Sequence, residues 1–86
     1  MIVGLRLFAT AREAAGRSSD TYELTDGATL DVLLGAAVDR YGDGFAAVLD
    51  AARVWVNGEE PPSGPASALH GGDEVAVLPP VSGGAA

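Results

Sequence analysis

The chain has 86 residues, enough for one domain, and 48% of them are apolar, enough for a small core. Twelve acidic residues against five arginines and no lysine give a net charge of −7. This balance argues against binding to nucleic acid or to an anionic membrane surface, because both require clustered positive charge. It favours a protein partner with a basic docking face, although an acidic surface that only maintains solubility explains the same charge equally well.

Cysteine is absent, so the sequence excludes disulfides, thiolate metal sites and a thiol nucleophile. A small domain that is stable without disulfides is typical of the cytoplasm. Residues 1–6 lack the charged start and long apolar run of a signal peptide, and no segment approaches the length of a membrane-spanning helix. We therefore expect a cytoplasmic protein.

The first part of the chain predicts two strands with a short helical turn between them. Apolar residues alternate over residues 2–8, which is typical of a strand with one buried face. Residues 9–16 are rich in alanine, and we expect a turn of helix that ends at Gly16. Residues 21–24 predict the second strand, and residues 26–27 (Asp-Gly) signal a tight turn after it.

Residues 30–41 give the clearest helical pattern, because their apolar residues recur at the 3.6-residue spacing of one buried stripe. Thr29 is a suitable N-cap and Gly42 is placed to end the helix. Residues 45–49 continue the apolar pattern as a short helical or irregular piece.

The last part of the chain predicts a hairpin and a final strand. Residues 53–56 read as a strand, and Asn57-Gly58 is a strong hairpin signal. Residues 59–62 return as a brief strand or extended edge that the prolines limit, and residues 63–72 form a loop with one possible helical turn. Residues 73–78 are the final strand.

This order of elements predicts an α+β fold with a mixed sheet of four to five strands and one main helix packed on one face. The order fits the β-grasp fold, and periodicity alone also allows other small α+β folds. We expect one domain over residues 1–78 and a flexible tail over residues 79–86.

The tail is the most informative segment. Pro79 and Pro80 restrict the backbone, remove two donors and stop the strand, so the residues after them should stand clear of the fold. Gly83 and Gly84 carry no side chain and can enter a channel too narrow for other residues. Chemistry on such a tail would use the main-chain carboxylate of Gly84, but two alanines follow it.

Three segments resemble one known family. Residues 7–16 resemble its opening LFA-x-x-RE-x-x-G, residues 56–58 its mid-chain VN hairpin, and residues 72–84 its ending GDEVA-x-x-PPV-[ST]-GG. The chain therefore resembles the small subunit of molybdopterin synthase, in the MoaD/ThiS group of ubiquitin-like sulfur carriers. The ending is the most specific of the three, because order, spacing and position near the terminus all agree.

The resemblance implies a sulfur relay with several partners. An ATP-dependent activating enzyme (MoeB-like) adenylates the terminal glycine, and a sulfur donor protein then converts the acyl-adenylate to a thiocarboxylate. The loaded tail enters the large subunit of molybdopterin synthase (MoaE-like) and gives its sulfur to cyclic pyranopterin monophosphate, which forms molybdopterin. The carrier binds no cofactor, since ATP is used by the activating enzyme, and it contributes no catalytic side chain.

The resemblance also assigns roles along the tail. Gly84 would carry the adenylate and then the thiocarboxylate, and Gly83 would allow threading. The guide that leads into the partner would consist of Pro79, Pro80, Val81 and Ser82.

Leu78 and Phe8 are the expected partner-binding residues on the sheet. If Val75 and Val77 face the helix, then Leu78 faces the other way, where a large apolar residue beside the tail suits docking. Packing of Leu78 on a local loop explains the pattern equally well. Phe8 and Trp55 carry the same two interpretations.

Other polar residues give weaker signals. His70 is alone, without a second ligand at metal-site spacing, and we expect it to be solvated. Asp73 and Glu74 are adjacent on a strand, so their side chains should point to opposite faces and not act as an acid–base pair.

Ala85 and Ala86 depart from the family pattern, which ends at the second glycine. A trimming protease that exposes Gly84 is the interpretation we favour over an artificial addition or an inactive homologue, because a blocked carboxylate cannot be adenylated. Three other functions stay open: sulfur delivery to cysteine, thiamin or a secondary metabolite; attachment to target lysines as a protein modifier; and an interaction domain with an inert tail.

Overall fold

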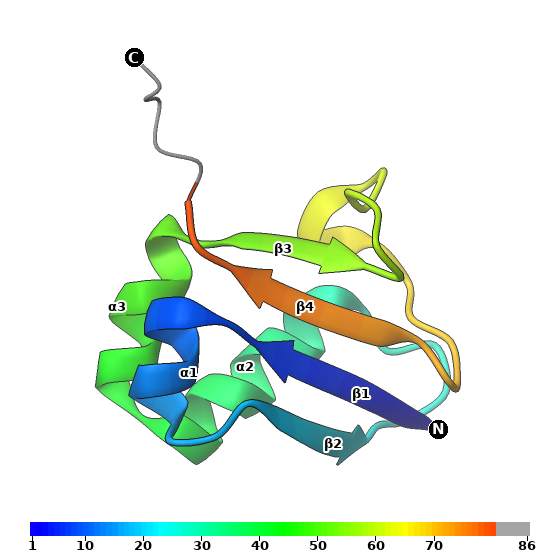
Figure 1. Ribbon diagram of the computed structural model, residues 1–86. Coiled ribbons are helices and arrows are strands. Elements are labelled where there is room, and N and C mark those ends of the chain that lie inside the picture. The colour runs from blue at the N-terminus through cyan, green and yellow to red at the C-terminus, as the bar shows by residue number, and fades with distance from the viewer. Residues whose placement is uncertain (81–86) are drawn as a thin grey trace.

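The computed structural model describes residues 1–80, which form a sheet covered on one face by helices (Figure 1). The elements in chain order are β1 (Ile2–Leu7), α1 (Ala9–Ala15), β2 (Ser19–Glu23), α2 (Leu30–Tyr41), α3 (Asp43–Ala51), β3 (Arg53–Val56), a single 3₁₀ turn (Gly64–Ala66) and β4 (Glu74–Leu78). None of the helices within residues 1–80 is long and apolar enough to cross a membrane.

The sheet has the strand order β2-β1-β4-β3 and is mixed. The first and last strands, β1 and β4, are parallel neighbours in the middle, and each edge strand is antiparallel to its neighbour. Because β1 and β4 run in the same direction, their carboxyl ends meet at one edge of the sheet. Phe8, directly after β1, therefore lies beside the end of β4, and its backbone N–H donates to the carbonyl of Val77 at 3.2 Å.

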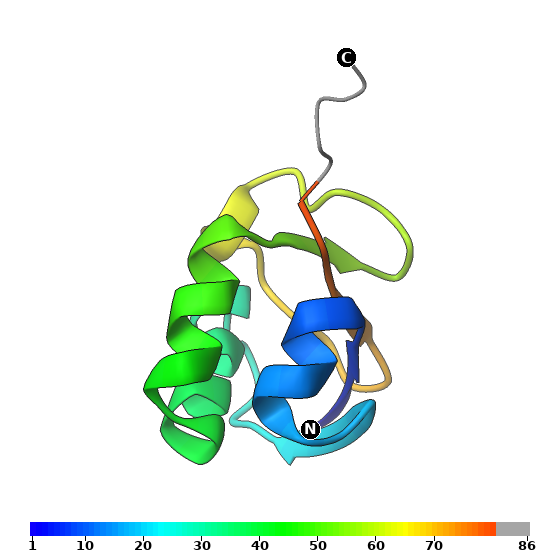
Figure 2. The ribbon, with the colours of Figure 1, turned by 60° about the vertical axis from the view of Figure 1, so that its left-hand side comes forward.

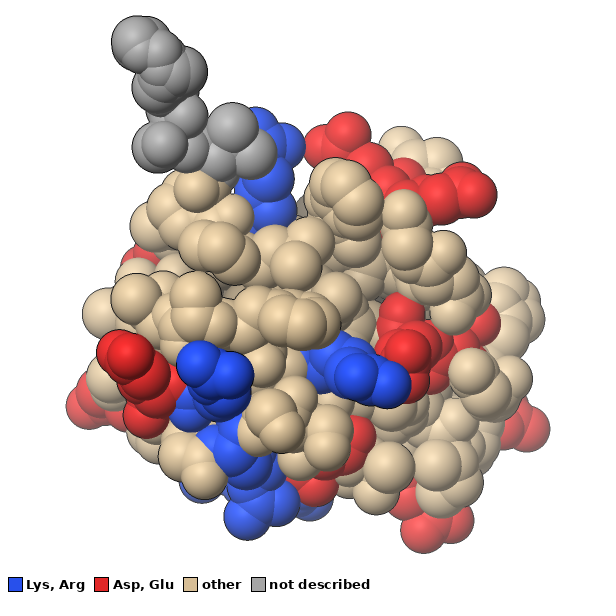
Figure 3. All heavy atoms as spheres, in the orientation of Figure 1, with Lys and Arg blue, Asp and Glu red and all other residues tan. Residues whose placement is uncertain are grey.

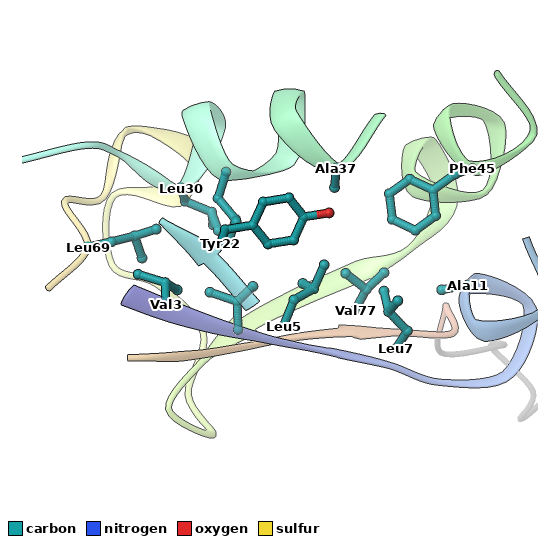
Figure 4. Close-up of a cluster of buried hydrophobic side chains, with 12 residues drawn as sticks. Val3, Leu5, Leu7, Ala11, Tyr22, Leu30, Ala37, Phe45, Leu69 and Val77 are labelled. Atoms are coloured by element: carbon teal, nitrogen blue, oxygen red, sulfur yellow. The ribbon is translucent and has the colours of Figure 1, made fainter. Parts of the chain in front are cut away.

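The core lies between the inner face of the sheet and the helices (Figure 4). Strand alternation turns Val3, Leu5 and Leu7 inward from β1, and Val75 and Val77 inward from β4, and all five are at most 1% exposed. The helices and loops complete the core with Ala11, Leu30, Leu33, Ala37, Phe45 and Leu69. Burial of this apolar surface supplies the main driving force for folding.

Three helices, and not one, cover the inner face. Residues 30–41 form α2 with the predicted bounds, and the segment expected to be helical or irregular is a complete helix, α3. Phe45 of α3 is fully buried, and its ring meets Tyr41 edge-on with centroids 5.1 Å apart. Figure 2 shows α2 and α3 side by side on the same side of the strands. The expected main helix, α2, is the longest of the three, and two shorter helices accompany it.

The predicted hairpin forms, but its return arm is not a strand. Asn57 and Gly58 both have left-handed backbones, with φ of 54° and 82°, as a tight two-residue turn requires. Beyond them only an isolated bridge joins Val56 to Glu59. Pro61 and Pro62 follow after Glu60 and lack the N–H groups that a continuing strand needs, so the sheet within residues 1–80 has four strands.

The side chain of Asn57 fastens this turn to the start of β4. Its Oδ1 accepts a hydrogen bond from the backbone N–H of Glu74 at 2.9 Å, and its Nδ2 donates to Oδ1 of Asp73 at 3.0 Å. The hydrogen bonds from the Asn57 amide and from the backbone of His70 lower the pKa of Asp73 below its ordinary value. Asn57 therefore has two roles, one in the turn and one in holding β4.

A polar cluster holds β2 against α2. The carboxylate of Asp20, only 10% exposed, accepts hydrogen bonds from the Tyr41 hydroxyl at 2.6 Å and from Nη1 of Arg40 at 2.8 Å. Burial alone would raise the pKa of Asp20, but these hydrogen bonds outweigh it and hold that pKa at about 2. Burial and the same hydrogen bond raise the pKa of the Tyr41 hydroxyl. The Arg40 guanidinium also lies over the ring of Tyr22, 4.2 Å from its centroid.

Candidate functional site

No helix within residues 1–80 covers the outer face of the sheet (Figure 1). We define this face by the strand residues whose side chains alternate with the buried ones. These residues are Ile2, Gly4, Arg6, Ser19, Thr21, Glu23, Arg53, Trp55, Glu74, Ala76 and Leu78. Figure 3 views this face: uncharged atoms cover much of it, blue and red atoms lie side by side near its middle, and most other acidic atoms lie towards its margin. A largely uncharged surface of this kind on a strongly acidic chain suits contact with another protein.

Strand register gathers three large apolar residues, Phe8, Trp55 and Leu78, at one end of this face, while Ile2 lies exposed at the other end of β1. Trp55 of β3 lies opposite Ala76 of β4, and Phe8 lies next to the end of β4 through its hydrogen bond to Val77. Phe8 is 41% exposed and Trp55 is 37% exposed, while Leu78 is partly exposed. We call Phe8, Trp55, Ala76 and Leu78 the outer patch.

Small residues leave the face hollowed beside the outer patch. A shallow hollow of about 510 Å³ is lined by Arg6, Phe8, Asn57, Gly58, Glu74 and Ala76. Its floor is low because Ala76, which lines it between larger residues, has a small side chain. Phe8 therefore stands at the rim of a depression that a partner side chain could fill.

A second hollow, of about 410 Å³, lies where the chain leaves the sheet. It is lined by Ala51, Ala52, Arg53, Val54, Trp55, Glu60 and Pro80. Pro79 and Pro80 are both exposed and lie outside β4, as the sequence predicts. The outer patch and the start of the tail are thus one continuous region.

The predicted site residues divide into two groups. Leu78 and Phe8 lie on the outer face and not in the core, which confirms the predicted alternation along β4 and places Phe8 beside Leu78. Val81, Ser82, Gly83 and Gly84 lie outside the described residues, so their roles stay predictions. Residues 79–80 are the part of the predicted guide that the structure describes.

Sequence reasoning missed Arg6 and Arg53 as members of this site. Arg6 lies opposite Ala76, and Arg53 lies opposite Leu78, so the two arginines flank the outer patch. Nε of Arg6 is 3.5 Å from Oε2 of Glu74. The strand pattern placed both arginines on exposed faces, but only the pairing of β4 with both neighbours brings them to Leu78 and Ala76.

The structure also locates the residues that gave weaker signals in the sequence. The His70 side chain is 80% exposed, with Nδ1 3.8 Å from Oδ2 of Asp73. Asp73 contacts Asn57 and the backbone of His70, whereas Glu74 contacts Arg6, so the two adjacent carboxylates face different surroundings. Within residues 1–80 no group of three or more metal-ligating side chains comes together.

Comparison with known proteins agrees with this geometry. The sequence profile of the ThiS family matches residues 5–84. The molybdopterin synthase sulfur carrier subunit of Chlamydomonas reinhardtii is 36% identical over 84 residues, which cover 98% of this chain and all of that protein. Small archaeal modifier protein 3 of Haloferax volcanii is 39% identical over 93 residues, again covering 98% of this chain and all of the relative.

A solved structure gives the same result for the fold. The crystal structure of SAMP1 from Haloferax volcanii superposes with a TM-score of 0.83 at 29% identity, covering 95% of this chain and 98% of that one. The ubiquitin-like β-grasp fold expected from the order of elements is thereby confirmed.

Proposed function

We propose that this chain, which belongs to the ThiS family of ubiquitin-like sulfur carriers, carries sulfur as a thiocarboxylate on Gly84 for the synthesis of molybdopterin. The main observation in support of the proposal is the path of β4. This central strand leads from the outer patch directly to Pro79-Pro80 and then, in sequence, to Gly83-Gly84. The end-to-end match to a molybdopterin synthase sulfur carrier subunit supports the choice of pathway.

The chemistry needs no side chain of this protein. The Gly84 carboxylate attacks the α-phosphorus of ATP on an activating enzyme, releases pyrophosphate and becomes an acyl-adenylate. The outer sulfur of a cysteine persulfide on a donor protein then displaces AMP, a good leaving group that the free carboxylate lacks, and forms an acyl disulfide. A second thiol attacks the sulfur of the donor cysteine, so that this thiol and the donor form a disulfide and the thiocarboxylate is released. The resulting thiocarboxylate is an ionised sulfur nucleophile held on a narrow tether, which gives it a high effective concentration inside the receiving enzyme.

The described residues supply the binding part of this function. Phe8 and Leu78 contact the activating enzyme and the large subunit of molybdopterin synthase, and Trp55 extends the same apolar area. Pro79 to Ser82 guide the tail into the partner, and Gly83 fits its narrowest part. Since ATP is consumed at the first step, the relay belongs in the cytoplasm.

The residues after Gly84 must be removed before activation, because a carboxyl group engaged in a peptide bond cannot be adenylated. A protease that cuts after Gly84 completes this proposal. Two purified forms test it: the 86-residue chain and a chain ending at Gly84. Each is incubated with the activating enzyme, ATP and a sulfur donor, and its intact mass is recorded. We expect thiocarboxylate on the shorter form alone.

Gly84→Ala in the shorter form tests the reactive position. We expect the variant to fold normally and to transfer no sulfur to the large subunit. Gly35→Ala is the matched control, because Gly35 lies within α2 with nothing within 4 Å of an added Cβ. Sulfur transfer by Gly84→Ala equal to that of Gly35→Ala would contradict the proposal.

A second candidate function follows from the similarity to small archaeal modifier protein 3. Gly84 would then form an amide bond with a lysine of a target protein. This chain has no lysine, so lysine-linked chains of itself cannot form, but single attachments can. Peptides in which Gly84 is joined to a target lysine, found in digests of the producing cells, would favour this function over sulfur delivery to molybdopterin.

A further inference from the structure

The outer face differs from the rest of the molecule in its charge. Among its strand residues are two arginines, Arg6 and Arg53, and two glutamates, Glu23 and Glu74. These charges balance, so the net charge of −7 resides on the rest of the chain. The acidic composition therefore does not describe the surface that the partner contacts.

Arg6 can bind a carboxylate from outside without leaving its neighbour. Its contact with Glu74 uses Nε, and both side chains are 56% exposed. A guanidinium has five N–H donors, and its two terminal nitrogens can form a paired contact with a second carboxylate. The Arg6–Glu74 ion pair is exposed and contributes little to stability. The contact with Glu74 instead keeps the Arg6 side chain at the hollow beside Phe8.

Arg53 lies at the other side of the outer patch. It is exposed, stands opposite Leu78, and lines the second hollow together with Trp55 and Pro80. Glu60 lines that hollow too, but within residues 1–80 no carboxylate lies within 4 Å of the Arg53 guanidinium. Arg53 is thus a positive charge beside the tail that an incoming acidic group can neutralise.

We propose that the protein surface which receives this chain carries carboxylates opposite Arg6 and Arg53, around an apolar centre that covers the outer patch. This inference rests on the proposed function, because the receiving protein is the one that takes the tail. It reverses the expectation of a basic docking face that net charge suggested. The rest of the chain holds the other three arginines against ten acidic residues, so an acidic partner is repelled least where it meets the balanced charges of the outer face. Charge therefore favours the orientation that presents the tail.

Binding of a charge-matched pair of variants tests the inference. Arg6→Gln with Arg53→Gln removes two positive charges from the outer face. Val32→Glu with Ala47→Glu adds two negative charges at exposed positions of α2 and α3, so both double variants change the net charge equally. Titration calorimetry measures their affinity for the purified activating enzyme and for the purified large subunit, with circular dichroism as the check of folding.

We expect the arginine variant to bind roughly tenfold more weakly, and the helix variant to change by less than about twofold. Glu60→Gln, which removes the acid that shares a hollow with Arg53, should strengthen binding. The inference is overturned if the arginine variant binds as tightly as the parent chain, if the helix variant weakens equally, or if the parent binds neither protein.

Thiocarboxylate formation in the same samples separates this inference from the proposed function. Normal loading and normal binding of the arginine variant would overturn the inference and leave the sulfur-carrier function intact. A parent chain that binds through its arginines but is never loaded would support the inference and contradict the sulfur-carrier function.

Discussion

The two faces of one sheet perform different tasks, and β4 contributes to both with alternate residues. Val75 and Val77 are fully buried under the helices, while Ala76 and Leu78, which alternate with them along β4, lie on the outer face. The inner face is apolar and closed, whereas the outer face is open and carries balanced charges. We therefore expect substitutions on the inner face to change stability and substitutions on the outer face to change partner binding, even at adjacent positions.

The largest effect should come from a carboxylate placed on the inner face. Val77→Asp buries an unpaired charge in the centre of the core, and the cost of several kcal/mol is comparable to the whole stability of a small domain. We expect this variant to be unfolded by circular dichroism. Leu78→Asp, one residue later, should lose about 1 kcal/mol or less and weaken partner binding. A large fall in the melting temperature of Leu78→Asp would place Leu78 in the core.

Phe45 and Trp55, two large aromatic residues on opposite sides of the sheet, give the next comparison. Phe45→Ala removes a fully buried ring, and we expect a loss of about 3–5 kcal/mol in the free energy of unfolding. Trp55→Ala removes a side chain that is 37% exposed on the outer face, and its loss should be much smaller. Urea unfolding of both variants, followed by circular dichroism, measures the difference. Equal losses would mean that the outer patch is part of the stabilising core.

The Asp20 cluster, which joins β2 to α2, predicts that the free energy of unfolding depends on pH. The folded pKa of about 2 lies below the ordinary value of 3.8, so the carboxylate stabilises the fold above about pH 4 and loses this effect as the pH falls towards 2. Asp20→Asn should therefore be less stable by about 2 kcal/mol at pH 7, with the difference shrinking near pH 2. Urea unfolding at both pH values checks this. A difference that stays constant with pH would contradict it.

The last comparison concerns the turn that aligns the outer face. Asn57→Gly keeps a residue that tolerates the left-handed φ of 54° but removes the hydrogen bonds to Asp73 and Glu74, so we expect a loss of about 1 kcal/mol. Asn57→Ala should lose roughly 1 kcal/mol more, because alanine also disfavours that backbone. Thermal unfolding compares the two, and equal stability of both variants would show that the turn geometry is unimportant.

Much of the fold could be predicted from local pattern. Alternation located the four strands, the helical stripe gave the bounds of α2, and Asn57-Gly58 marked the turn. Residues 45–49 were ambiguous, because a short apolar run does not distinguish a helix from an irregular piece, and only the burial of Phe45 shows why α3 forms.

The candidate site could be predicted only in part. Leu78 followed from alternation, since its neighbours on β4 had to face the core. Arg6 and Arg53 could not be assigned, because lateral pairing between strands distant in sequence is not encoded in the period of any one strand. The same reason explains why net charge alone does not describe the charge balance of the outer face.

The intact mass of the untagged protein, isolated from its own cells, tests the central claim most directly. The account predicts a species that ends at Gly84, part of it heavier by the difference between a sulfur and an oxygen atom. That result would establish both the removal of the residues after Gly84 and the loading of sulfur. A single species that ends at Ala86 would leave the carboxyl group of Gly84 blocked and would contradict the sulfur-carrier function.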